Sequence, residues 1–159
     1  MMDWRQKTDD WRRKTDDRRQ ETDDRRRKTE NGVRPPVYKF QRLKVYQLAL
    51  EYVDMIYTLA SQLPSSERFN LKTQFERAAT SIVLNIAEGS TGQSNAEQAR
   101  FLGMATRSYL ETIACCDLAE RRSYLTYEQL KPLRDLGHRL FIKLQALKRS
   151  LKRTQNDHL

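Results

Sequence analysis

The sequence predicts an all-α fold: an up-down-up-down antiparallel four-helix bundle over residues 37–153, behind an N-terminal arm of charged heptad repeats. Four segments carry apolar residues at alternating spacings of three and four, which is the period of an amphipathic helix. The connections between these segments are short, about four to six residues, and short connections place neighbouring helices antiparallel. The four segments do not repeat one another, which argues against a helical solenoid.

The arm is a tandem repeat. Residues 4–31 are four copies of a seven-residue unit, WRQKTDD, WRRKTDD, RRQETDD and RRRKTEN. A coiled coil needs two apolar residues in each heptad, and only Trp4 and Trp11 are apolar here. We therefore predict a disordered, solvated arm and linker over residues 1–36, with a lone charged helix as the alternative. A Pro-Pro pair at the end of this segment marks the linker to the bundle.

The first predicted helix, residues 40–63, has a wide apolar face. Two apolar series run along it at helical spacing, and the remaining series is polar throughout. A helix with one apolar stripe buries that stripe in its own bundle. We therefore expect part of this helix to contact something beyond one small core. The two series are Leu43, Tyr46, Leu50, Val53, Tyr57 and Ala60, and Val45, Leu48, Tyr52, Met55 and Leu59.

Capping residues mark the ends of the other three predicted helices. The second covers residues 68–88, with Gly89 as its C-terminal cap residue. The third covers residues 94–122 and starts with a capping box, Ser-Asn-Ala-Glu. The fourth starts at Thr126 with a similar box, Thr-Tyr-Glu-Gln, and ends before a tail over residues 154–159. The expected inward-facing residues are Leu71, Phe75, Ala78, Ile82 and Ile86, then Ala99, Leu102, Thr106, Tyr109, Ile113 and Cys116, then Leu130, Leu133, Gly137, Leu140, Leu144, Leu147 and Leu151.

The composition limits the function classes. The chain has 30 Lys and Arg against 21 Asp and Glu, a net charge of +9 and a pI near 9.8, and such a balance attracts polyanions. The two adjacent cysteines and two histidines match neither a disulfide framework nor a metal-ligand spacing, so we expect no metal and no cofactor. No N-terminal apolar run resembles a secretory signal, and no segment reaches the roughly 20 apolar residues of a membrane span. We therefore expect a cytoplasmic protein without membrane contact.

Positive charge gathers at the C-terminal end of the chain. Residues 121–159 contain ten basic residues against three acidic ones. Contacts from such residues would go to phosphates, so binding to RNA or DNA would be sensitive to salt and weakly sequence-specific. A basic helix face that is only solvated is the alternative. The candidate nucleic-acid-binding residues are Arg121, Arg122, Lys131, Arg134, Arg139, Lys143, Lys148, Arg149, Lys152 and Arg153.

An enzyme is the rival function class. Catalysis would need convergent acid, base or nucleophile groups, and the paired Glu-x-x-His motifs of di-iron bundles are absent from the sequence. We therefore expect no enzyme activity. A structural or adaptor protein that docks a protein partner is a further possibility. The residues considered for catalysis, which form no known catalytic spacing, are Glu76, Glu88, Glu111, His138 and Cys115.

One stretch resembles a known family. Residues 74–90, QFERAATSIVLNIAEGS, resemble the motif of the four-helix bundle proteins encoded within intervening sequences of 23S rRNA genes. The segment FQRLKVYQLALEYV is similar to the first helix of that family, and residues such as Phe101 and Ala105 fit its third-helix pattern. The sequence departs from the family where Val83 replaces a frequent proline and where the loop over residues 90–93 lacks a basic residue. The uncharged loop weakens an anion-binding role for it.

The resemblance implies a four-helix bundle that assembles into a ring-like homopentamer. A related branch is the accessory variability determinant of diversity-generating retroelements, a basic pentamer that works with a reverse transcriptase and binds nucleic acid. The resemblance therefore makes RNA or DNA, a reverse transcriptase and further copies of the chain the expected partners. It also implies structural roles for Arg77, Asn85, Glu88, Gly89, Ser108 and Glu111.

The antiparallel register of the second and third helices predicts which of these structural residues contact one another. Positions facing each other across the hairpin place Arg77 beside Ser108 and Glu111, and Asn85 near Phe101. We predict that Arg77 and Glu111 form an ion pair inside the bundle. Removal of one member of a buried pair costs roughly 3–5 kcal/mol, whereas two exposed residues would be nearly independent.

Overall fold

The computed structural model describes residues 38–156 with the exception of residue 93, and the predicted arm lies outside the described residues. The elements in chain order are a short 3-10 helix η1 (Lys39–Arg42), helix α2 (Lys44–Ala60), a second 3-10 helix η2 (Ser65–Glu67), and helices α3 (Leu71–Gly89), α4 (Asn95–Arg121) and α5 (Tyr127–Asn156). The described residues are therefore all-helical, as predicted.

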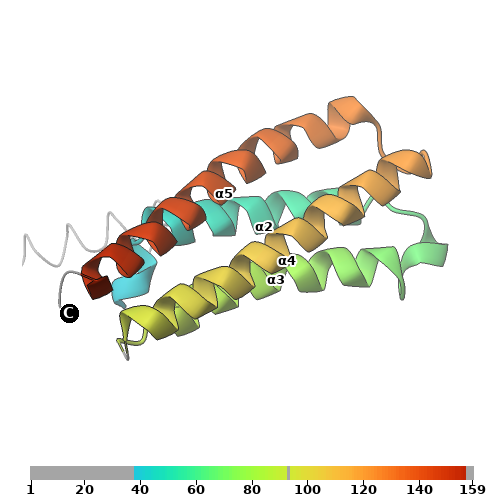
Figure 1. Cartoon of the computed structure of the whole chain (residues 1–159). Coiled ribbons are helices and arrows are strands. Elements are labelled where there is room, and N and C mark those ends of the chain that lie inside the picture. The colour runs from blue at the N-terminus through green and yellow to red at the C-terminus, as the bar shows by residue number, and fades with distance from the viewer. Residues whose placement is uncertain (1–37, 93, 157–159) are drawn as a thin grey trace, which may run out of the picture. The chain divides into compact units, whose positions relative to one another are not determined.

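The four α-helices pack as an antiparallel bundle in which each helix has two neighbours (Figure 1). Helix α3 packs against α2 and α4, and α5 also packs against α2 and α4. The backbones of the diagonal pairs make no contact in the part of the chain that the structure describes. This arrangement places the first half of α4 beside the second half of α5, which matters for the site below.

The helix ends confirm the predicted box before α5 and the predicted Ser94 cap of α4. At the start of α4, the Ser94 hydroxyl accepts a hydrogen bond from the Glu97 backbone N–H at 3.1 Å. Before α5, Thr126 and Gln129 form the reciprocal box: each side chain accepts a hydrogen bond from the other residue's backbone N–H, at 3.3 and 2.8 Å. These bonds satisfy backbone donors that lack a partner in the first turn of a helix.

Other predicted boundaries were wrong. The first helix does not start at residue 40, because Leu43 adopts an extended backbone (φ −69°, ψ 125°) that separates η1 from α2. Gly89 is not the cap residue either, since it lies in the last turn of α3 and Ser90 follows with a φ of −94°. A Cβ at Gly89 would lie 2.8 Å from the Cβ of Phe101. The glycine therefore allows a close approach of α3 and α4.

The centre of the bundle is built around Tyr52. Its ring is fully buried, and its hydroxyl lies 2.8 Å from the Thr112 hydroxyl across the diagonal between α2 and α4. Because Thr112 donates its own proton to the Tyr109 carbonyl at 2.6 Å, Tyr52 is the donor to Thr112. A Cβ at Gly137 would lie 2.8 Å from the Tyr52 ring and 2.9 Å from the Tyr109 ring. The predicted inward position at Gly137 thus makes room for two aromatic rings.

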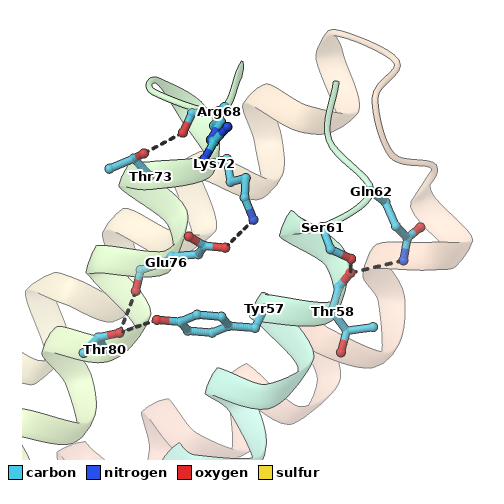
Figure 2. Close-up of polar contacts among 9 residues, drawn as sticks. All are labelled: Tyr57, Thr58, Ser61, Gln62, Arg68, Lys72, Thr73, Glu76 and Thr80. Carbon is cyan, nitrogen blue, oxygen red and sulfur yellow. Dashed lines mark hydrogen bonds and ion pairs between the residues drawn. The ribbon is translucent and has the colours of Figure 1, made fainter. Parts of the chain in front are cut away.

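The first apolar series of α2, which begins at Leu43, is only partly covered. Leu50 is 37% exposed and Tyr57 is 46% exposed, although both belong to the apolar face that the sequence predicts. Figure 2 shows Tyr57 reaching from α2 to α3, where its hydroxyl lies 3.1 Å from that of Thr80. Thr80 donates to the Glu76 carbonyl, so Tyr57 is the donor to Thr80. The described chain on its own leaves part of this face open to solvent.

Candidate nucleic-acid interface

A basic groove lies between the first half of α4 and the second half of α5. Its volume is about 490 Å³. Four cationic side chains line it, Arg100 and Arg107 from α4 and Lys148 and Lys152 from α5, and we call it the α4–α5 groove. The remaining lining residues are Ala96, Ala99, Gly103, Met104 and Thr106, so the lining contains no carboxylate.

The four cations have no counter-charge within the described residues. None of them takes part in an ion pair there. Lys148 is half-buried, and a Cβ at Gly103 would lie only 3.2 Å from its ammonium nitrogen. Like charges held close together repel each other, and partial burial makes the repulsion stronger. An anion in the groove would relieve this repulsion, which makes the groove a candidate phosphate site.

The groove includes only two of the ten predicted basic residues, Lys148 and Lys152. Arg139, Lys143 and Arg149 are exposed on α5 and do not line the groove. Arg121 and Arg122 lie at the other end of the bundle, in and directly after the last turn of α4. The side chain of Arg153 lies outside the described residues.

Two further predicted residues are already neutralised by neighbouring carboxylates. Arg134 is half-buried, and its guanidinium lies 3.0 Å from Asp117 and 2.9 Å from Glu120 on α4. Lys131 lies 2.6 Å from Asp135 one turn along α5. Arg134 therefore connects α4 to α5, and its charge is not available to a phosphate in the way the sequence suggested.

The sequence reasoning missed Arg100 and Arg107. Both lie on α4, seven residues apart and hence on one side of the helix. Arg100 also lies over the ring of Phe101, with its guanidinium carbon 5.5 Å from the ring centroid. The antiparallel register of α4 and α5 is the signal that points to them. Residues equally far from the connecting loop face each other, so both arginines face the second half of α5.

The predicted buried pair of Arg77 and Glu111 is wrong. Both residues are exposed, and no ion pair joins them among the described residues. Arg77 points away from the core because it lies on the side of α3 opposite Phe75 and Ile82. We now expect removal of the Arg77 side chain to change stability by no more than about 1 kcal/mol.

Serine and asparagine side chains join α3 and α4 instead. The Ser81 hydroxyl accepts hydrogen bonds from Ser108 at 2.9 Å and from the side-chain amide of Asn85 at 3.0 Å. Asn85 is buried and also donates to the Ser81 carbonyl at 2.8 Å. Ser81 therefore links Asn85, on its own helix, to Ser108 on α4 through hydrogen bonds. Glu88 is exposed.

The five residues considered for catalysis do not meet at one site: Glu111 and Cys115 line one cavity, Glu76 and Glu88 line another, and neither lining includes His138. Glu76 lies 2.6 Å from Lys72 in an ion pair on the flank of α3 (Figure 2). Burial raises the pKa of the Cys115 thiol to about 11, with a further contribution from Glu111, so the thiol is protonated at neutral pH. His138 is exposed on α5. Among the described residues, no group of three His, Cys, Asp or Glu side chains could hold a metal ion.

Comparison with known proteins identifies similar chains. A family profile described as 23S rRNA-intervening sequence protein matches residues 41–146. A crystal structure from Bacteroides thetaiotaomicron, described as a protein with unknown function from the S23 ribosomal protein family, is 27% identical. The similarity covers 66% of this chain and 95% of that one, with a TM-score of 0.61. No curated protein matches the chain. Within the described residues, no helix is long and apolar enough to cross a membrane.

Proposed function

Because the chain belongs to the 23S rRNA-intervening sequence protein family, we propose that it is a non-enzymatic, basic, homo-oligomeric bundle that binds nucleic acid in the cytoplasm with low sequence specificity. The α4–α5 groove carries this proposal, since it combines four unpaired cations with a lining free of carboxylates. Its cations would contact phosphates, which are the same in every sequence. No aromatic ring lines the groove, so stacking on unpaired bases would contribute little to affinity.

Matched charge reversals test the groove. We expect Arg107→Glu together with Lys148→Glu to weaken binding of a short duplex at least about 100-fold, because hydrogen bonds to charged groups contribute about 1.5–3 kcal/mol each. The control is Arg139→Glu together with Lys143→Glu, which changes the net charge equally at exposed positions outside the groove. Fluorescence anisotropy measures the affinity, and circular dichroism checks that both variants keep their helix content. An equal loss in the control would mean that net charge, not the groove, determines binding.

Assembly is the second part of the proposal. The partly open apolar face of α2, with Leu50 and Tyr57 exposed, supports an interface between copies, and the family resemblance suggests a homopentamer. Light scattering on the purified protein is expected to give about five times the chain mass of 18.9 kDa. Leu50→Arg is expected to lower the oligomer mass without loss of helix content. A monomer at micromolar concentration in the unmodified protein would contradict assembly.

An adaptor that docks a protein partner, such as a reverse transcriptase, is the alternative. Exposed apolar side chains on α3 and α4 favour it, because Leu84, Leu110 and Leu118 are each more than half exposed. An adaptor would show no affinity for RNA or DNA even at low salt, so the anisotropy measurement separates the two functions.

A further inference from the structure

The two ends of the bundle differ in charge. The end that contains the α4–α5 groove carries mainly basic side chains, whereas the end with the α2–α3 and α4–α5 connections carries acidic and basic ones in similar number. Several cations at the second end are already paired, among them Lys72, Lys131 and Arg134. These ion pairs occupy Glu76, Asp117, Glu120 and Asp135, so three of the carboxylates at this end, Glu67, Glu111 and Glu128, are outside ion pairs within the described residues. The acidic residues of this end are Glu67, Glu76, Glu111, Asp117, Glu120, Glu128 and Asp135.

A cavity of about 280 Å³ opens at this end, between the start of α3 and the last turns of α4. Its apolar wall consists of Leu71 from α3 and Ala114, Cys115 and Leu118 from α4. Leu118 is 53% exposed, so apolar surface continues from the cavity onto the outside of α4. The volume is small for a binding pocket, and it suits one side chain better than a whole cofactor.

One carboxylate of the cavity is held in place by the protein. The Glu67 side chain accepts hydrogen bonds from the Tyr124 hydroxyl at 2.9 Å, from the Asn70 amide at 3.0 Å and from the Leu71 backbone N–H at 3.3 Å. The Tyr124 bond and the Leu71 bond are the main reasons why the pKa of Glu67 is lowered. Glu67 therefore keeps its negative charge and its position.

The second carboxylate has no partner. Glu111 lines the same cavity, is exposed, and forms no hydrogen bond or ion pair among the described residues. Arg122 is the cation of the lining. The two carboxylates outnumber the one guanidinium, so the lining has a net negative charge. With its apolar wall, it suits a positive group carried on an apolar stem. The side chains of lysine and arginine have this form, because their methylene groups pack on apolar surface while the charged end seeks an anion.

We propose that this cavity, the Glu111 pocket, receives a lysine or arginine side chain from a basic segment of a partner protein. The positive end lies against the Glu111 carboxylate, and the methylene stem lies against Ala114 and Leu118. An apolar neighbour in the same segment covers the exposed part of Leu118. The pocket and the α4–α5 groove lie toward opposite ends of α4, so a basic protein segment and a nucleic acid can bind to one subunit at the same time.

Titration of the full chain with a capped Leu-Arg-Leu peptide tests the pocket. Methyl NMR is expected to show saturable shifts at Ala114 and Leu118 and none at Ala99 in the groove. A peptide in which neutral citrulline replaces arginine is expected to bind about fivefold more weakly, which is near the upper limit for an exposed ion pair. Equal binding of the citrulline peptide, or no saturation at millimolar peptide, would overturn the proposal.

Variants distinguish binding of the peptide in the pocket from general electrostatic attraction of the peptide to the protein. Glu111→Lys is expected to abolish saturable binding, and Ala114→Phe, which fills the cavity without a change of charge, is expected to do the same. The control Glu128→Lys makes the same charge change at an exposed residue outside the pocket and is expected to leave binding in place. If Glu128→Lys weakens the peptide as much as Glu111→Lys, the pocket is not the site. Duplex binding is expected to survive Ala114→Phe, so failure here is distinguishable from failure of the nucleic-acid proposal.

Discussion

An increase in salt from about 50 to 200 mM is expected to weaken duplex binding by roughly 10³- to 10⁵-fold, the range for about six to ten phosphate contacts. Each groove offers four cations, so the grooves of two neighbouring subunits would supply this number. Each cation that neutralises a phosphate releases condensed counterions, and added salt opposes that release. A plot of log affinity against log salt, measured by fluorescence anisotropy, gives the number of contacts from its slope.

The slope of this plot also identifies which residues contact phosphates. Each lost contact lowers the steepness by about 0.9 for duplex DNA, so Arg107→Glu with Lys148→Glu is expected to give a shallower line than the unmodified protein. The pair Arg139→Glu and Lys143→Glu is expected to leave the slope nearly unchanged. Duplexes of different sequence are expected to give similar lines, because phosphate contacts carry no sequence information. An affinity that does not change with salt concentration would exclude phosphate contacts as the basis of binding.

Tyr52→Ala is expected to lower the free energy of unfolding by about 3–5 kcal/mol, as truncation of a buried aromatic residue does elsewhere. The Tyr52 ring is fully buried, lies 5.8 Å from the Tyr109 ring between centroids, and fills the space that Gly137 leaves. Urea unfolding at a fixed protein concentration measures the change, because the stability of an oligomer depends on concentration. Tyr127→Ala is the control, since Tyr127 at the start of α5 is 53% exposed, and a loss of no more than about 1 kcal/mol is expected there.

The hydroxyl of Tyr52 can be tested separately. Thr112→Val removes its acceptor and leaves a buried donor without a partner in the described core, which costs about 1–3 kcal/mol. Tyr52→Phe combined with Thr112→Val removes the donor as well, so the double variant is expected to recover part of that loss. A double variant no more stable than Thr112→Val alone would show that the hydrogen bond between the two hydroxyls has little energetic effect.

The sequence predicted the helices because amphipathic periodicity is a local property. The predicted positions at Phe75, Ile82 and Leu140 are buried, and the boxes at Ser94 and Thr126 form hydrogen bonds, since capping depends on residues within one turn. Boundaries were less accurate where tertiary contacts intervene. Gly89 looked like a cap from its place after a helix, but its role depends on Phe101, a residue of the next helix.

The sequence by itself thus determined the helical class, the apolar faces and the excess of positive charge on this chain. Only the tertiary structure decided which charges meet. Arg77 and Glu111 lie on outward sides of their helices, Arg134 is neutralised by Asp117 and Glu120, and Lys148 faces the first half of α4. The physical reason is that a helix period shows which residues share a face of one helix. The rotation and register of packed neighbours decide which residues that face meets.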